Sequence, residues 1–338
     1  MARVKVGQGL RRSASNVRQP ILALVLFLLC SSSLSQAQTQ QPPPIRVSVN
    51  RVNVGVTVTD SSGHFIEGLH REDFQVFDNS VEQPITDFLP IEEPAQLLLL
   101  IEAGPAVVFL SQNHLRAADA LLIAIAPTDR VAIATYSRSP QLLLDFTPNK
   151  AAARYALQNI NFGNDFADLN LSSSLAATID SLAPLPGKKT IVLLSTGVDT
   201  SSAPNWPLVQ QKLNTSDVRI LAVSLAGDLR EPAKRKKLSP RERSERTQVK
   251  EVFGEADKWL GGLVRATGGR AYFPTNEKEF ASAYAEIAEL IRHEYSLAFA
   301  PPAADNQLHV LEVKVKGSAY QVDHRQAYLA PTSTTGSH

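Results

Sequence analysis

The sequence predicts a doubly wound, mostly parallel α/β domain inserted in a small antiparallel β domain that the N- and C-terminal strands build together. Two observations lead to this fold class. Between residues 96 and 293, apolar runs suited to buried parallel strands alternate with helical patterns. Residues 45–92 and 294–331 instead alternate apolar and polar positions, as half-buried strands do. Each flanking segment is too short to be stable alone, which favours packing of the two into one β-sandwich-like domain.

Residues 1–37 have the pattern of a cleaved secretory signal peptide. Five basic residues and no acidic one precede the apolar run Ile21–Cys30, and Ser35 and Ala37 are small residues at a cleavage site. Ten apolar residues are too few to span a bilayer, so we expect an exported, periplasmic or extracellular chain without a transmembrane segment, with an uncleaved anchor as the alternative. The chain without its signal has 29 basic and 33 acidic residues and no cysteine. This composition argues against nucleic-acid binding and leaves no thiol for a disulfide.

The flanking β segments are predicted in chain order. Residues 38–44 (QTQQPPP) are a polar, proline-rich linker. The alternating stretch VSVNRVNVGVTVTD then predicts strands, and further strands are expected at QVF and at residues 83–89. The C-terminal segment has strand patterns at 295–301, 308–317 and 320–331, and the tail 332–338 is expected to be disordered.

The α/β domain has a regular order of elements. Strands are expected at 97–103, 130–136, 190–196, 218–225 and 270–274, with an edge strand at 142–146. Helices are expected near 110–125, 150–160, 170–182, 207–215, 254–267 and 277–292. The segment 227–250 interrupts this order with nine basic and four acidic residues and almost nothing apolar. It is expected to be a solvated, mobile insertion, and a basic docking surface for an acidic partner or anionic lipid is the alternative.

The chain resembles the VWFA-related proteins abundant in Acidobacteria, which are secreted proteins built around a von Willebrand factor A-like domain. The resemblance rests on VNVGVTVTDSSGHFIEGLHREDFQVFDN, HEYSLAFAP and LHVLEVKVKG. It also rests on YQVDHRQAYLAP, which is similar to the family's closing arginine-then-tyrosine segment. The resemblance implies a von Willebrand A-like fold for the α/β domain.

Many von Willebrand A domains bind Mg²⁺ at a metal-ion-dependent adhesion site, and the resemblance maps this site onto changed residues. The first-loop positions for Asp, Ser and Ser fall on Glu102, Gly104 and Ala106, and the third-loop Asp position falls on Thr196. Two hydroxyls and one carboxylate are therefore missing from the oxygen ligands that Mg²⁺ requires. The resemblance thus implies a degenerate site without a cofactor. A looser Mg²⁺ or Ca²⁺ site formed by Glu102, Asp168 and Asp199 is the alternative.

Catalytic patterns are scarce in this sequence. The seven histidines lack metal-ligand spacing, and no nucleophile elbow of the Gly-x-Ser-x-Gly kind occurs. Gly268 and Gly269 lie between a predicted helix and a strand, where they favour a helix C-cap over a phosphate cradle. No enzyme is therefore predicted.

The predicted function is an exported, non-catalytic protein-interaction or adhesion-type module. It would bind a protein or a surface polymer through the loops at the top face of the α/β domain, without a functional metal site. A cation-dependent adhesion module, a structural component of an envelope assembly and an exported hydrolase are the alternatives. Trp206 is either an exposed contact or a core residue. The candidate partner-binding residues are Glu102, Gly104, Asp168, Thr196, Asp199 and Trp206.

Overall fold

The computed structural model describes residues 51–104, 107, 111–162, 168–227, 239–303, 305–317 and 319–330. All of them belong to one compact unit, Val49–His338. The predicted signal peptide, linker and C-terminal tail lie outside the described residues, as do Ala106 and residues 228–238 of the predicted insertion.

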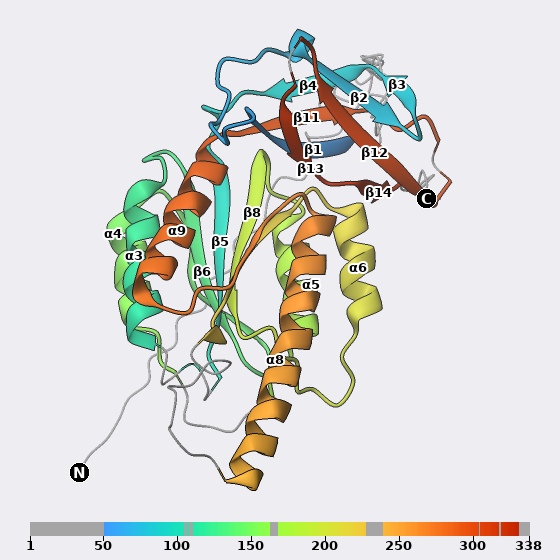
Figure 1. Ribbon diagram of the computed structural model, residues 1–338. Coiled ribbons are helices and arrows are strands. Elements are labelled where there is room, and N and C mark those ends of the chain that lie inside the picture. Colours follow the sequence, from blue (N-terminus) through green and yellow to red (C-terminus); the bar gives the residue numbers. More distant parts are fainter. Residues whose placement is uncertain are drawn as a thin grey trace, which may run out of the picture. The chain divides into compact units, whose positions relative to one another are not determined.

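A six-stranded sheet forms the centre of the α/β domain (Figure 1). Its strands are β5 (Ala95–Glu102), β6 (Arg130–Tyr136), β7 (Pro140–Thr147), β8 (Lys188–Ser195), β9 (Arg219–Ser224) and β10 (Ala271–Tyr272). The order is β10-β9-β8-β5-β6-β7, and every neighbouring pair is parallel except β6 and β7. Each residue of the two central strands β5 and β8 is buried, which explains their continuous apolar runs.

Helices cover both faces of this sheet (Figure 1). One face carries α3 (Ser111–Ala124), α4 (Lys150–Gln158) and α9 (Glu277–Arg292), and the other carries α5 (Leu171–Leu182), α6 (Trp206–Thr215) and α8 (Pro240–Ala266). Four helices begin after an asparagine whose side chain accepts a hydrogen bond from a backbone N–H of the first turn. These caps are Asn149, Asn170, Asn205 and Asn276. The doubly wound α/β class predicted from the sequence is confirmed.

Helix α8 begins earlier than the sequence predicts. We expected this helix near 254–267, after a solvated, mobile insertion at 227–250, but α8 already begins at Pro240. Ser239 and Glu242 form a capping box, and Pro240 occupies the first helical position, where its missing N–H has no cost. The buried residues of α8 begin only at Ala256, so the first turns are exposed. Local capping defines this helix start, since no buried apolar face does.

Two four-stranded antiparallel sheets form the β domain, in the orders β13-β1-β11-β4 and β14-β12-β2-β3. The N-terminal strands are β1 (Val52–Thr59), β2 (Phe74–Asp78), β3 (Val81–Gln83) and β4 (Ile85–Leu89). The C-terminal strands are β11 (Glu294–Phe299), β12 (Leu308–Val315), β13 (Gln321–His324) and β14 (Ala327–Leu329). Each sheet thus contains strands from both ends of the chain, as the sequence predicts. Their inward side chains form one apolar core.

Two predicted strands are each divided between the two sheets. The strand expected at 83–89 is divided at Pro84. Gln83 ends β3 in one sheet, and the residues after Pro84 form β4 in the other sheet. Proline lacks the N–H that continuous pairing needs. The strand expected at 320–331 is likewise interrupted at Arg325 and Gln326, which separate β13 from β14.

Buried polar side chains connect the β domain with the α/β domain. The guanidinium of Arg219 donates from Nη1 to Glu294 Oε2 (3.2 Å) and Thr57 Oγ1 (2.9 Å), and from Nε to the carbonyl of Gly268 (3.0 Å). Gly55 leaves room for this pair, because a Cβ there would lie 2.5 Å from Glu294 Oε1.

Arg325 makes a second connection between the two domains. Its guanidinium donates to the backbone carbonyls of Leu213, Asn214 and Ser216 at the end of α6. Burial lowers its pKa to about 10, so the side chain remains charged at neutral pH, and a cation stabilises a helix C-terminus. Arg325 belongs to the closing arginine-then-tyrosine segment recognised in the sequence.

No helix among the described ranges has the length and apolar character needed to cross a lipid bilayer.

Candidate functional site

The candidate site lies at the carboxyl edge of the central sheet. Glu102 ends β5, Tyr136 ends β6 and Ser195 ends β8, with Thr196 directly after it. Because these strands are parallel neighbours, their carboxyl ends meet at one edge, where α/β folds commonly bind ligands. All four side chains are buried, and Glu102 has no exposed surface.

Internal donors surround the carboxylate of Glu102. Its Oε2 accepts hydrogen bonds from the backbone N–H (2.7 Å) and the hydroxyl (2.8 Å) of Thr196. The hydroxyls of Tyr136 (3.1 Å) and Ser195 (3.2 Å) donate to the same oxygen, and these two hydroxyls lie 2.6 Å apart. The second oxygen, Oε1, lies 3.1 Å from the Thr196 hydroxyl. We call these four residues the Glu102 network.

Burial controls the titration of this network. It raises the pKa of Glu102, and the hydrogen bonds from Thr196, Tyr136 and Ser195 act in the opposite direction without cancelling it. Burial and the charge of Glu102 together raise the pKa of Tyr136, so this hydroxyl keeps its proton and remains a donor. The network therefore consists of an acid with neutral donors and contains no cationic side chain.

A second group of hydrogen bonds joins the two loops above the network. Asp199 accepts from the backbone N–H groups of Ser172 (2.8 Å) and Ser201 (3.0 Å). Leu169 and Thr200 form two hydrogen bonds with each other. Thr200 N–H donates to the Leu169 carbonyl, and Leu169 N–H donates to the Thr200 hydroxyl. The loop before α5 and the loop after β8 are therefore held together by their own polar groups.

Gly104 packs directly against Leu169. A Cβ at position 104 would lie 2.7 Å from Leu169 Cδ2, closer than real carbon atoms approach. The hydroxyl residue that a metal-ion-dependent adhesion site has at this position would have no space here unless Leu169 moved.

The described residues of this edge do not fit an adhesion-type magnesium site. Mg²⁺ requires near-octahedral oxygen ligands. Here the oxygens of Glu102 accept internal hydrogen bonds, Thr196 uses its N–H and hydroxyl to donate to them, and Gly104 offers no side chain. Nor does any group of three or more histidine, cysteine, aspartate or glutamate residues within the described part of the chain have an arrangement that could hold a metal ion.

Several candidate residues are not available for direct contact with a partner. Glu102 and Thr196 were expected at the binding surface, but both are buried and bond to each other. Gly104 is buried beneath Leu169. Asp199 is half-buried and accepts hydrogen bonds from the backbone of both loops, whereas Asp168 is exposed. The structure thus separates residues that shape this edge from one that faces solvent.

Trp206 is half-buried and packs against the core of the α/β domain. It starts α6, and its ring centroid lies 3.9 Å from that of Trp259 in α8. The sequence did not reveal this partner, since Trp259 lies far along the chain. It also did not identify Tyr136 and Ser195 as members of the Glu102 network, although polar residues that end buried apolar runs are a usable signal.

Comparisons with known proteins give only distant similarities. No protein-family model matches the sequence, and no curated protein matches it either. Among solved structures, the chain is similar to the conserved hypothetical protein BatB from Bacteroides thetaiotaomicron, with 10% identity and a TM-score of 0.40 over 59% of this chain and 97% of that one. The PilB minor pilin from Streptococcus sanguinis has 12% identity and a TM-score of 0.39 over 61% of this chain and 63% of that one.

A third similarity is to the vWF domain of the type V pili tip protein Mfa5 from Porphyromonas gingivalis. It has 15% identity and a TM-score of 0.29, over 31% of this chain and 38% of that one. All three TM-scores lie below 0.5, too low for a conclusion about this chain.

Proposed function

We propose that this chain is an exported, non-catalytic interaction module that binds a protein or a surface polymer through the loops at the carboxyl edge of its central sheet, without a metal ion. The observation that carries this proposal is the burial of Glu102 among internal donors. A carboxylate in this state is available neither to a cation nor to a substrate. The resemblance to VWFA-related proteins supports a von Willebrand A-like module with a degenerate adhesion site, and the signal-like residues 1–37 support export.

The exposed residues of this edge form the proposed contact surface. They are Arg138 after β6, Asp168 before α5, and Thr200, Ser202, Ala203, Pro204 and Asn205 after β8. Glu102 and Asp199 then have a positioning role, because they fix the loops that carry these residues. A surface held in one conformation loses less entropy on binding than a mobile one.

A binding assay with matched charge reversals tests this proposal. The chain from Gln38 onward is added to an envelope preparation from the organism that encodes it, with either Mg²⁺ or EDTA present. We expect equal saturable binding in both conditions, because no cation takes part. Asp168→Arg is expected to weaken binding roughly tenfold, the effect of losing one well-placed polar contact of about 1.4 kcal/mol.

Glu93→Arg is the matched control, since Glu93 is also exposed but precedes the amino end of β5. Binding that requires Mg²⁺, or equal binding by the two variants, would contradict the proposal. Calorimetric titration with Mg²⁺, Mn²⁺ and Ca²⁺ separates these outcomes further. Ion binding that Glu102→Ala abolishes would favour a cation-dependent module instead.

A further inference from the structure

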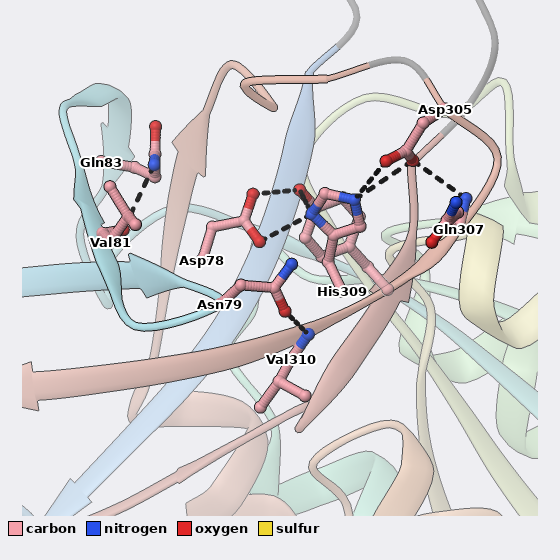
Figure 2. A network of polar contacts seen from close by, with 9 residues as sticks. Asp78, Asn79, Val81, Gln83, Asp305, Gln307, His309 and Val310 are labelled. Carbon is pink, nitrogen blue, oxygen red and sulfur yellow. Dashed lines mark hydrogen bonds and ion pairs between the residues drawn. The ribbon is translucent and has the colours of Figure 1, made fainter.

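A histidine lies between two aspartates at one end of the sheet β14-β12-β2-β3 (Figure 2). His309, near the start of β12, has its Nδ1 2.7 Å from Oδ1 of Asp78, the last residue of β2. Its Nε2 lies 3.2 and 3.3 Å from the two carboxylate oxygens of Asp305, in the loop before β12. His309 and Asp78 are buried, whereas the Asp305 side chain is 38% exposed.

The buried aspartate has a second partner on the last strand. Tyr328 of β14 donates its hydroxyl to Asp78 Oδ2 (2.8 Å) and lies directly opposite His309 in the pairing of β12 with β14. Burial and the negative charge of Asp78 raise the pKa of Tyr328, so this hydroxyl keeps its proton. The titratable groups that face His309 are therefore Asp78 from β2, Asp305 from the preceding loop and Tyr328 from β14.

The number of protons on His309 determines how many of these contacts it can make. A neutral imidazole has one N–H and can donate to one carboxylate only, whereas an imidazolium donates from both nitrogens. Burial lowers the pKa of His309, but the hydrogen bonds to Asp78 and Asp305 outweigh it, and the pKa lies above its usual value.

The contact with Asp305 reaches the C-terminal strand through the backbone. Asp305 accepts from the N–H of Gln307 (3.0 Å), and the same loop exchanges two hydrogen bonds with the end of β14. Asn306 N–H donates to the Ala330 carbonyl, and Ala330 N–H donates to the Gln307 carbonyl, both at 3.0 Å. Strand β14 has only three residues, so these two bonds add to its pairing with β12 in holding its end.

We propose that His309 is a pH-operated clasp: its imidazolium joins Asp78 to Asp305 and so holds β14 in place, and loss of the Nε2 proton to solvent releases Asp305 and loosens the end of that strand. The direction follows from linkage. A group whose pKa is raised by folding stabilises the structure below its unfolded value of about 6.5, and this contribution is lost as pH rises through the folded value.

NMR on the chain from Gln38 onward tests the clasp with two readouts. The His309 ring is expected to titrate above pH 6.5, and its signal is assigned by its absence from His309→Gln. Amide exchange at Asn306 and Ala330, corrected for intrinsic rates, is expected to lose protection by about tenfold for each unit by which the pKa is raised. A ring that titrates at or below pH 6.5, or protection that does not change with pH, would overturn the proposal.

Two matched variants distinguish the clasp from general pH effects. Asp305→Asn removes the exposed carboxylate that His309 contacts and leaves the buried pair of His309 and Asp78 intact. The pKa of His309 should therefore fall, and the protection of the Ala330 amide should no longer depend on pH. Asp60→Asn is the control, because Asp60 contacts His64 at 3.2 Å in an exposed pair. This control should leave His309 unchanged. If Asp305→Asn keeps the pH dependence, the clasp is wrong.

Discussion

Two buried carboxylates in this molecule are held in different ways. Glu102 ends β5 and Asp78 ends β2, and each accepts a hydrogen bond from a buried tyrosine, Tyr136 in one case and Tyr328 in the other. The remaining donors to Glu102 are neutral, whereas Asp78 faces His309. Burial raises the pKa of Glu102 because no cation offsets it. A carboxylate can therefore be buried in two ways, with donors alone or with a titratable counter-charge.

The largest expected effect comes from breaking the network of Asp78, His309 and Tyr328. Asp78→Ala leaves the His309 imidazolium and the Tyr328 hydroxyl buried without their acceptor, and should lower the free energy of unfolding by about 3–5 kcal/mol. Urea denaturation near pH 6 measures this loss. Asp87→Asn is the control, since the pair of Asp87 with Arg51 is exposed and should contribute about 0.5 kcal/mol. A loss for Asp78→Ala no larger than that for Glu102→Ala would remove the distinction between the two networks.

A smaller effect is expected at Glu102. Glu102→Ala leaves the Thr196 and Tyr136 donors unsatisfied and should cost about 2–3 kcal/mol, whereas Glu102→Gln keeps an acceptor and should cost about 1 kcal/mol. The raised pKa of Glu102 adds a pH dependence. Its stabilisation is complete below the ordinary glutamate value of about 4.3 and is lost as pH rises through the folded value. Urea denaturation of wild type and Glu102→Gln should therefore show the wild-type advantage shrinking as pH rises. An advantage that grows instead would contradict this assignment.

The smallest expected effects come from removing the hydroxyl of each buried tyrosine, which compares Tyr136 with Tyr328 directly. Tyr136→Phe should cost about 1 kcal/mol, the typical net value of a hydrogen bond. Tyr328→Phe should cost about twice as much at a pH where Glu102 keeps its proton, because only the acceptor of Tyr328, the aspartate paired with His309, then gives a charge-assisted hydrogen bond, which is stronger. Thermal or urea unfolding of the two variants at the same pH gives the ratio. Equal losses would mean that the charge of Asp78 does not strengthen its bond to Tyr328.

Much of the fold could be predicted from the sequence where one physical signal dominates. The run RVAIATY matches β6, Arg130–Tyr136, because a strand buried on both faces requires apolar residues throughout. The amphipathic pattern at 277–292 likewise matches α9, Glu277–Arg292. The start of α8 could not be found in this way, because its first turns bury no apolar residue and depend on the capping box of Ser239.

The sequence predicts where the candidate site lies, but not that the carboxylate of Glu102 is buried and hydrogen-bonded there. The sequence places Glu102 at the end of a buried strand, and a ligand site is expected there. Its burial depends on donors from Tyr136 and Thr196, which only the strand order brings to it. The sequence also could not show that a side chain at position 104 would collide with Leu169, since these two residues lie far apart in the chain.

The shared sheets of the β domain also determine the order in which the molecule can fold during synthesis. Val52 of β1 pairs with Phe299 of β11, and Asp78 of β2 pairs with Leu311 of β12. Strands β1 and β2 therefore wait for these partners, which are made only after the whole α/β domain. Strands β5 to β10 need no residue from the flanking segments for their own pairing. The α/β domain can thus fold first, and the β domain assembles only when the C-terminal strands arrive.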